Sequence, residues 1–184
     1  MGRLIYTGIT SLDGYVADES GSFDWSRPDE EVHRFVNGLD RHVRTHLLGR
    51  RMYEVMAYWD SVPADEPDAV QEYAQIWQGA DKVVFSRSLA GVSAPRTRLE
   101  REFTPQAARA IVEATDGDVS VGGAELAGQA LKAGLVDELQ QLFCPVVIGG
   151  GKRFLPDGLQ LDLELLEQRR FGNGVVFVRY RVLN

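Results

Sequence analysis

The sequence has a single cysteine and no long apolar run, and these absences exclude several classes of protein. One thiol, Cys144, cannot form an intramolecular disulfide or a zinc site built from several thiolates. It lies in the apolar stretch 142–148, which predicts a buried side chain rather than a nucleophile. No apolar segment reaches the ~20 residues of a membrane-spanning helix, and no basic and apolar leader opens the sequence. We therefore expect a cytoplasmic protein without a membrane partner.

Positive charge is also scarce. The chain has 20 Lys and Arg side chains against 27 Asp and Glu, for a formal net charge of −7. This balance does not provide the basic surface that nucleic acids require, so we expect no nucleic acid partner. The histidines His33, His42 and His46 have no further ligands clustered around them, which predicts no metal site and surface positions for these side chains.

The order of apolar patterns predicts an α/β fold. A length of 184 residues corresponds to about one domain, which we expect to span residues 1–184. Strand-like runs at 3–10, 46–48, 82–86, 118–121 and 138–148 alternate with helical patterns that begin near Asp29, Arg50, Ala69, Pro105 and Ala124. Two extended runs at 159–171 and 175–183 flank Asn173-Gly174, which is typical of a hairpin. The prediction is a mixed, mostly parallel sheet with a C-terminal antiparallel hairpin.

Three strand ends carry residues suited to phosphate. Ligands of such sheets bind beyond the carboxyl ends of the strands. Gly49-Arg50-Arg51, Ser86-Arg87-Ser88 and Gly122-Gly123-Ala124 each follow a predicted strand. Glycine permits close approach of the backbone, a helix start attracts anions, and arginine binds phosphate with two hydrogen bonds. Each junction alone is weak, but together they fit one elongated ligand with several phosphates, and the arginines and serines favour NADPH over NADH.

Six motifs in a fixed order carry a resemblance to a known family. They are GITSLDG at 8–14, LLGR at 47–50, VVFS at 83–86, VGGAEL at 121–126, GLVDEL at 134–139 and PVVIGGG at 145–151. Together they resemble the C-terminal reductase domain of riboflavin biosynthesis and its stand-alone relatives in the dihydrofolate reductase superfamily. The resemblance implies a dihydrofolate-reductase-like three-layer fold and a homodimer. It also implies a reductase that transfers a hydride from NADPH to a pterin-, folate- or riboflavin-precursor-like heterocycle, as a 5-amino-6-(5-phosphoribosylamino)uracil reductase does.

The same resemblance implies roles for the strand-end residues. Gly49, Arg50 and Arg51 would hold the cofactor phosphates, and Ser86 and Arg87 would lie near the adenosine 2′-phosphate. The pyrophosphate would lie against Gly122, Gly123, Ala124, Glu125 and Leu126. Residues 11–14 would border the nicotinamide and the substrate. Residues 149–152 (GGGK) lack the spacing of a phosphate-binding loop, so we expect them to be structural.

Three carboxylates are candidate proton donors. Residues 25–30 resemble the start of the acid-bearing helix of dihydrofolate reductase, which makes Glu30, or Asp29 with a one-residue shift, a candidate acid. Asp13 is the other candidate. The alternatives are that Asp29 and Glu30 complement the helix dipole and that Asp13-Gly14 forms a turn.

Some features depart from the family pattern or fit two uses. Val121 and Tyr15 replace a glutamate and a basic residue that the riboflavin reductases usually carry. A non-catalytic nucleotide- or flavin-binding sensor on the same fold is therefore the second hypothesis.

Aromatic side chains could line a flat heterocycle pocket or fill the core: Trp25, Trp59, Trp77, Tyr53 and Tyr58.

Overall fold

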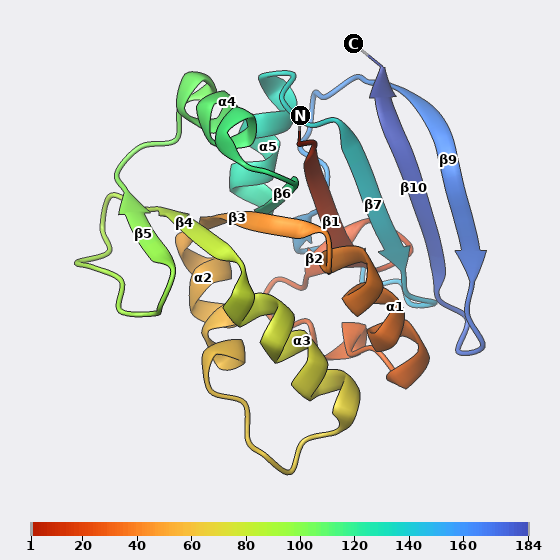
Figure 1. Ribbon diagram of the computed structural model, residues 1–184. Coiled ribbons are helices and arrows are strands. Elements are labelled where there is room, and N and C mark those ends of the chain that lie inside the picture. The colour runs from red at the N-terminus through yellow and green to blue at the C-terminus, as the bar shows by residue number, and fades with distance from the viewer. Residues whose placement is uncertain (1, 184) are drawn as a thin grey trace.

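A computed structural model describes residues 2–183, and its centre is an eight-stranded sheet (Figure 1). The strands are β1 (Leu4–Thr10), β3 (Val43–Gly49), β4 (Asp81–Phe85), β5 (Thr97–Glu100), β6 (Asp118–Gly122), β7 (Glu138–Phe143), β9 (Asp162–Arg170) and β10 (Val176–Leu183). Their order across the sheet is β5-β4-β3-β6-β1-β7-β10-β9. Neighbouring strands are parallel except that β10 runs antiparallel to both β7 and β9. The predicted mixed sheet with a C-terminal hairpin is confirmed.

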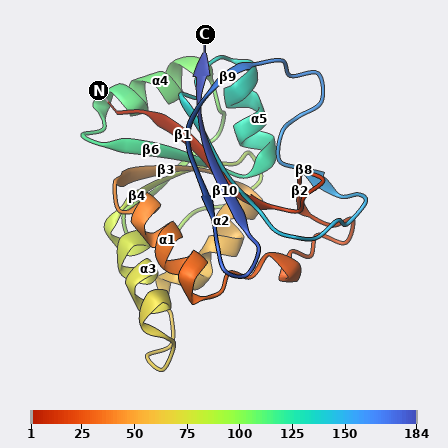
Figure 2. The same ribbon diagram turned by 90° about the vertical axis from the view of Figure 1, so that its right-hand side faces the viewer.

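Helices cover both faces of the sheet (Figures 1 and 2). On one face lie α1 (Glu30–Asp40), α2 (Arg50–Met56) and α3 (Asp68–Gly79), with the short 3-10 helices η1 (Asp24–Ser26) and η2 (Ala57–Asp60). On the other face lie α4 (Pro105–Ala114) and α5 (Ala124–Lys132). The buried side chains form one apolar cluster beneath α4 and α5 and two beneath α1 and α3. This is the three-layer arrangement of dihydrofolate reductase that we expected.

Two helices begin where the sequence places a cap. The Asp29 carboxylate accepts a hydrogen bond from the Val32 amide at 3.0 Å, at the start of α1. The Thr104 hydroxyl accepts one from the Ala107 amide at 3.1 Å, just before Pro105 opens α4. Each cap satisfies a backbone N–H that has no partner within the helix, which fixes the first turn.

The structure differs from the predicted elements in two places. The strand predicted for 138–148 ends at Phe143, because Pro145 has no N–H for a ladder and the chain turns there. Three short strands were missed: β5, and the separate pair of β2 (Tyr15–Ala17) and β8 (Lys152–Arg153). These strands have two to four residues each, too few to show a regular alternation.

The predicted surface position of His46 is wrong. Strand β3 begins at Val43, so His46 lies in mid-strand between β4 and β6, and its side chain is buried with 5% exposed. Its Nδ1 lies 2.6 Å from the hydroxyl oxygen of Ser120.

Cys144 is buried, as predicted. Within residues 2–183, every helix is too short or too polar to cross a membrane.

Candidate cofactor and active site

The three glycine- and serine-bearing junctions meet at one edge of the sheet. Strands β4, β3 and β6 are consecutive neighbours, and their carboxyl ends pair Gly49 with Phe85 and Leu48 with Gly122. Gly123 has φ = +95°, a conformation that favours glycine, and a β-carbon at this residue would lie 3.8 Å from the Gly49 nitrogen. The starts of α2 and α5 are therefore in contact, as a single ligand that spans both requires.

Neither of these two helices has a side-chain cap. Gly49 precedes α2 and Gly123 precedes α5, and within residues 2–183 the first-turn amides of neither helix donate to a capping side chain. In contrast, α1 and α4 start with Asp29 and Thr104 as caps. The first-turn amides of the nine-residue helix α5 are thus available to an anion, and its dipole adds positive potential. Residues 122–126, where the sequence predicts the pyrophosphate, form this helix start.

Arginines surround the β3 and β4 junctions. The Arg50 guanidinium donates to Glu54 at 2.8 Å and to the Ser88 hydroxyl at 3.0 Å, so it bridges α2 and the loop after β4. Arg87 is exposed and pairs with Glu102 at 3.1 Å. Both pairs are on the surface, where such contacts contribute little, so a phosphate can replace the carboxylates. Arg51, also exposed, opens α2 beside them.

The side chains of two predicted cofactor residues, Ser86 and Leu126, have structural roles. The Ser86 hydroxyl is buried and accepts a hydrogen bond from the Leu89 amide at 3.1 Å, which shapes the loop after β4. Ser88 is the hydroxyl that lies beside Arg50. The Leu126 side chain is buried in the core, so only its backbone is free to face a ligand.

Glu125 places a negative charge within the first turn of α5. Its side chain is 78% exposed and accepts a hydrogen bond from the Lys152 ammonium group at 2.7 Å. The Lys152 hydrogen bond and charge, with a smaller contribution from Arg51, lower the pKa of Glu125. Lys152 comes from β8, a strand that the sequence did not predict.

The three candidate acids all have partners in the structure. Asp13 accepts hydrogen bonds from the amides of Gly149 and Ile148, at 2.8 and 3.2 Å. A hydrogen bond from Ser11 and these amides lower the pKa of Asp13, which disfavours proton donation. Asp29 is the α1 cap, and Glu30 forms an exposed ion pair with Arg34 at 2.7 Å. Within residues 2–183, Glu30 differs from Asp13 and Asp29 in that its carboxylate accepts no hydrogen bond from a backbone amide.

The aromatic side chains divide between core and site. Trp77 is a buried residue of α3, and Trp59 packs on Tyr73 with ring centroids 4.5 Å apart. Trp25 is half-buried against the cluster that contains Leu142 and Cys144, at the carboxyl end of β7. Within residues 2–183 its buried indole N–H has no hydrogen-bond partner. An unpaired buried donor costs about 1–3 kcal/mol, so Trp25 is suited to pair with a polar ligand.

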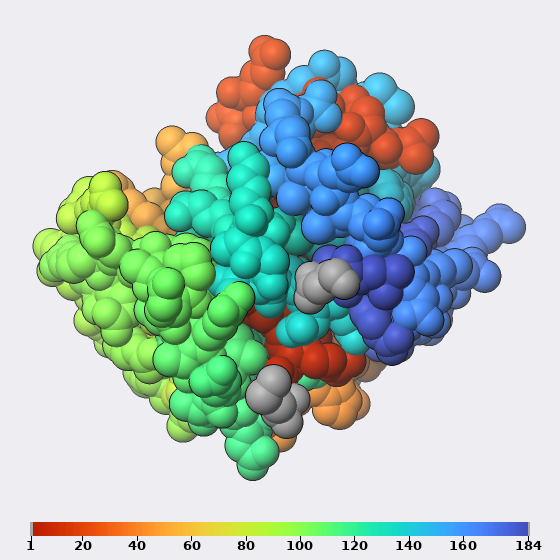
Figure 3. Space-filling model, turned by 90° about the horizontal axis from the view of Figure 1, so that it is seen from above, coloured from red at the N-terminus to blue at the C-terminus, as the bar shows by residue number. Residues whose placement is uncertain are grey.

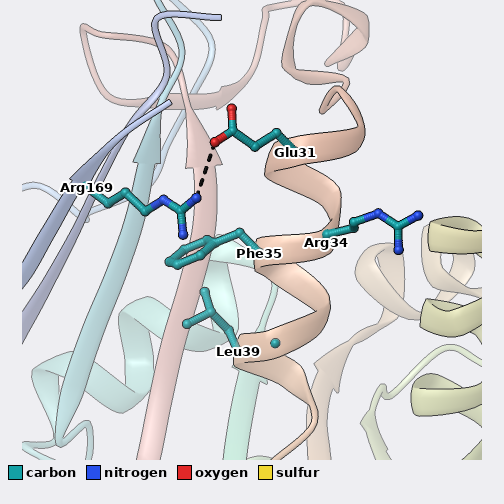
Figure 4. A pocket seen from close by; sticks show the side chains of 6 residues that line it. Glu31, Arg34, Phe35, Leu39 and Arg169 are labelled. Carbon is teal, nitrogen blue, oxygen red and sulfur yellow. Dashed lines mark hydrogen bonds and ion pairs between the residues drawn. The ribbon is translucent and has the colours of Figure 1, made fainter. Parts of the chain in front are cut away.

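A hollow on another face lies outside this constellation. It has a volume of about 480 Å³ and is lined by Glu31, Arg34, Phe35, Gly38, Leu39 and Arg169. Figure 4 shows the Glu31–Arg169 ion pair across it, with Arg34 pointing away. The Arg169 guanidinium lies 5.1 Å from the centre of the Phe35 ring. This pair joins α1 to the hairpin and is structural.

One titratable group away from the strand ends was not found from the sequence. Asp40, near the end of α1, accepts a hydrogen bond from the Tyr73 hydroxyl at 2.8 Å, and burial raises the pKa of Asp40 to about 6. Nothing in its local sequence distinguishes it from a surface carboxylate.

Within residues 2–183, no group of three His, Cys, Asp or Glu side chains could hold a metal ion.

Comparison with known proteins decides the family. The RibD C-terminal domain family matches residues 3–177. The chain belongs to this family. It is 28% identical over 182 residues to the uncharacterised protein YyaP of Bacillus subtilis, an alignment that covers 97% of this chain and 94% of YyaP.

Two solved structures illustrate the fold of this RibD C-terminal domain protein. A Shewanella sp. PV-4 protein with a proposed role in riboflavin biosynthesis superposes with a TM-score of 0.77 at 21% identity, covering 99% of each chain. Enterococcus faecalis dihydrofolate reductase, solved with NADP(H), superposes with a TM-score of 0.65 at 14% identity, covering 100% of this chain and 98% of its own. Both superpositions show the dihydrofolate-reductase-like fold. Because the sequence identities are low, they show the fold alone.

Proposed function

We propose that the protein is an NADPH-dependent reductase of a pterin-, folate- or riboflavin-precursor-like heterocycle. The observation that carries the proposal is the meeting of three phosphate-suited junctions at the ends of β4, β3 and β6. The Gly123 and Gly49 backbones approach closely there, and Arg50 links α2 to Ser88 after β4. Membership of the RibD C-terminal domain family and the fold shared with an NADP(H)-bound reductase support it.

The chain offers a separate set of groups to each part of the dinucleotide. The uncapped first turn of α5, with Gly122, Gly123 and Ala124, would hold the pyrophosphate. Gly49, Arg50 and Arg51 would contact phosphates from the side of α2, and Arg87 and Ser88 would hold the adenosine 2′-phosphate. A bidentate arginine–phosphate contact is selective for NADPH, because NADH lacks that phosphate.

The reaction needs an electron donor, a flat binding surface and an acid. NADPH, when bound, supplies the hydride. Trp25, packed at the carboxyl end of β7, offers an aromatic surface and an unpaired indole N–H for a heterocycle carbonyl or ring nitrogen. We assign proton donation to Glu30, which can leave its exposed Arg34 partner while Asp29 and Asp13 hold backbone amides.

Hydride transfer is tested by following the absorbance of NADPH with a panel of dihydropteridines, dihydrofolates and aminopyrimidinediones. We expect one class to accelerate NADPH oxidation well above the buffer rate, and Glu30→Gln to lower kcat at least about 100-fold without changing the Kd for NADPH. Asp13→Asn is the comparison variant for proton donation. Unchanged turnover in Glu30→Gln would exclude Glu30 as the donor.

The second candidate function is a non-catalytic nucleotide or flavin sensor. The engaged state of all three candidate acids favours it, because none of them is a half-buried carboxylate set aside for proton transfer. Tight dinucleotide binding without turnover of any heterocycle in the panel would support this function over the reductase.

We also propose that two copies pair along β9, one of the two outer strands of the sheet. All nine of its residues are exposed or half-buried, and Leu165 is 52% exposed. Antiparallel pairing centred on Leu166 places Asp162 of each copy opposite Arg170 of the other, and neither forms an ion pair within residues 2–183. An unpaired edge with self-complementary charges is suited to such pairing.

A further inference from the structure

The segment after β7 brings a cation to the start of α5. Strand β8 pairs with β2, with Lys152 opposite Ala17, and the Lys152 side chain reaches Glu125 in the first turn of α5. In the view of Figure 3, α5 (teal) and the segment that follows β8 (blue) lie side by side. The two segments border a hollow of about 400 Å³ whose lining includes Glu125 and Lys152. The Lys152 ammonium group therefore lies beside the first turn of α5, next to the residues to which the proposed function assigns the pyrophosphate.

The backbone of Lys152 is held firmly on both sides. Gly151 has φ = +128°, and a β-carbon there would collide with the Ala17 carbonyl oxygen, so β8 and β2 are packed without a gap. Two residues later Phe154 is buried, and its ring stacks on Tyr6 with centroids 4.2 Å apart. The Phe154 amide also donates to the Gly14 carbonyl at 2.9 Å. The anchored backbone keeps the base of the Lys152 side chain close to α5, so that its ammonium group can reach the first turn of that helix.

Glu125, the partner of Lys152, is an acidic residue at a helix start that would bind the negatively charged dinucleotide. Glu125 is an exposed carboxylate beside the uncapped amides of α5, where an anionic ligand would experience its repulsion. Arg51, from the start of α2, contributes to the same electrostatic environment and, after Lys152, lowers the pKa of Glu125. Lys152, through a hydrogen bond, and Arg51, through its charge, thus both stabilise the ionised form of this carboxylate. A pyrophosphate offers both of them stronger charge-assisted hydrogen bonds than that carboxylate does.

We propose that Lys152 is a further cofactor-binding residue, whose ammonium group exchanges the Glu125 carboxylate for the pyrophosphate of the bound dinucleotide. This inference rests on the proposed function, since it requires a dinucleotide at the start of α5. Glu125 can turn into solvent when the ligand arrives, because its side chain is largely exposed. Lys152 contacts a group common to NADPH and NADH, so it adds affinity without selecting between them.

The test is calorimetric titration of purified variants with NADPH and with NADH. Lys152→Gln should weaken binding of both about tenfold, with the NADPH-to-NADH ratio unchanged, since one hydrogen bond to a charged group is lost. Lys152→Arg should bind within about twofold of wild type. Arg109→Gln is the control: Arg109 is an exposed basic residue of α4 and lies outside the lining of the hollow. It should bind like wild type.

The Glu125→Gln variant distinguishes an exchange of partners at Lys152 from an ion pair that only stabilises the fold. If Lys152 exchanges partners, this variant should bind NADPH as tightly as wild type or a few-fold tighter, because the competing carboxylate is gone. Weakening equal to that of Lys152→Gln would overturn the inference. So would wild-type affinity in Lys152→Gln, or equal losses in Lys152→Gln and Arg109→Gln. A wild-type protein that binds neither dinucleotide would overturn the proposed function together with this inference, whereas the other outcomes leave the proposed function intact.

Discussion

Acidification should destabilise the protein through His46. The imidazole is buried between β3, β6 and α3, with its Nδ1 at the Ser120 hydroxyl and its ring centre 5.0 Å from that of Trp77. Within residues 2–183 its Nε2 has no partner, and the nearby buried Lys82 ammonium group donates to the carbonyl oxygens of Trp77 and Ala80. Burial, with a smaller contribution from the Lys82 charge, lowers the pKa of His46 to about 4.

The sign and size of the effect follow from this pKa. The unfolded chain binds a proton at His46 near pH 6.5, whereas the folded chain resists it down to about pH 4. The free energy of unfolding therefore keeps its full value above about pH 6.5 and decreases as pH falls toward 4. At pH 4.5 the loss amounts to about 2.5 kcal/mol of the free energy of unfolding. That is a large share of the stability of a domain, which is typically ~5–15 kcal/mol.

Urea unfolding of wild type and His46→Gln between pH 7 and pH 4.5 measures this loss. The difference in free energy of unfolding between the two proteins should shift by about 2.5 kcal/mol in favour of the variant as pH falls. All other titrating groups, including Asp40, are common to both proteins and cancel in the difference. His42→Gln is the control, since His42 is exposed on the same segment. A wild-type minus His46→Gln difference that does not vary with pH would refute the reasoning.

Four further predictions concern single residues. Arg87→Gln should weaken NADPH binding about tenfold and leave NADH binding unchanged, as measured by titration; equal losses for both would remove Arg87 from the 2′-phosphate site. Gly123→Ala should lower the free energy of unfolding by about 1–3 kcal/mol in urea melts, because φ is +95° and the new methyl would lie 3.4 Å from the Met52 β-carbon; wild-type stability would contradict this. Asp40→Asn should raise stability at pH 7 by at most about 3 kcal/mol, because the pKa of Asp40 is raised to about 6 and its ionised form is disfavoured in the folded protein; the gain should vanish below pH 4. Leu165→Glu should convert a dimer to a monomer in sedimentation equilibrium, while Leu155→Glu, exposed elsewhere, should not; a dimer that persists would exclude pairing along β9.

The elements that carry local signals could be predicted from the sequence. Asp29 and Thr104 precede apolar positions at helical spacing, so both helix starts follow from capping chemistry. Asn173-Gly174 lies between two extended runs and forms the hairpin turn of β9 and β10, with Gly174 at φ = +89°. The glycine junctions after β3 and β6 were predicted because parallel strands bring their carboxyl ends to one edge.

Features that depend on contacts between distant segments could not be predicted. The burial of His46 depends on strands β4 and β6 on either side of it, and the raised pKa of Asp40 comes from burial beside Tyr73, a residue of another helix. Strand β8 has two residues and exists only because β2 lies beside it, so the reach of Lys152 to α5 has no local signal. The same limit applies to Ser86, whose hydroxyl serves its own loop.

Titration of the purified protein with NADPH and NADH, followed by calorimetry, tests the central claim most directly. We expect tight NADPH binding and at least about tenfold weaker NADH binding, because Arg50 and Arg87 flank the expected position of the 2′-phosphate. Gly123→Val should abolish both, because a branched side chain would fill the approach between Gly123 and the start of α2. Equal affinity for the two dinucleotides, or no binding of either, would contradict the account.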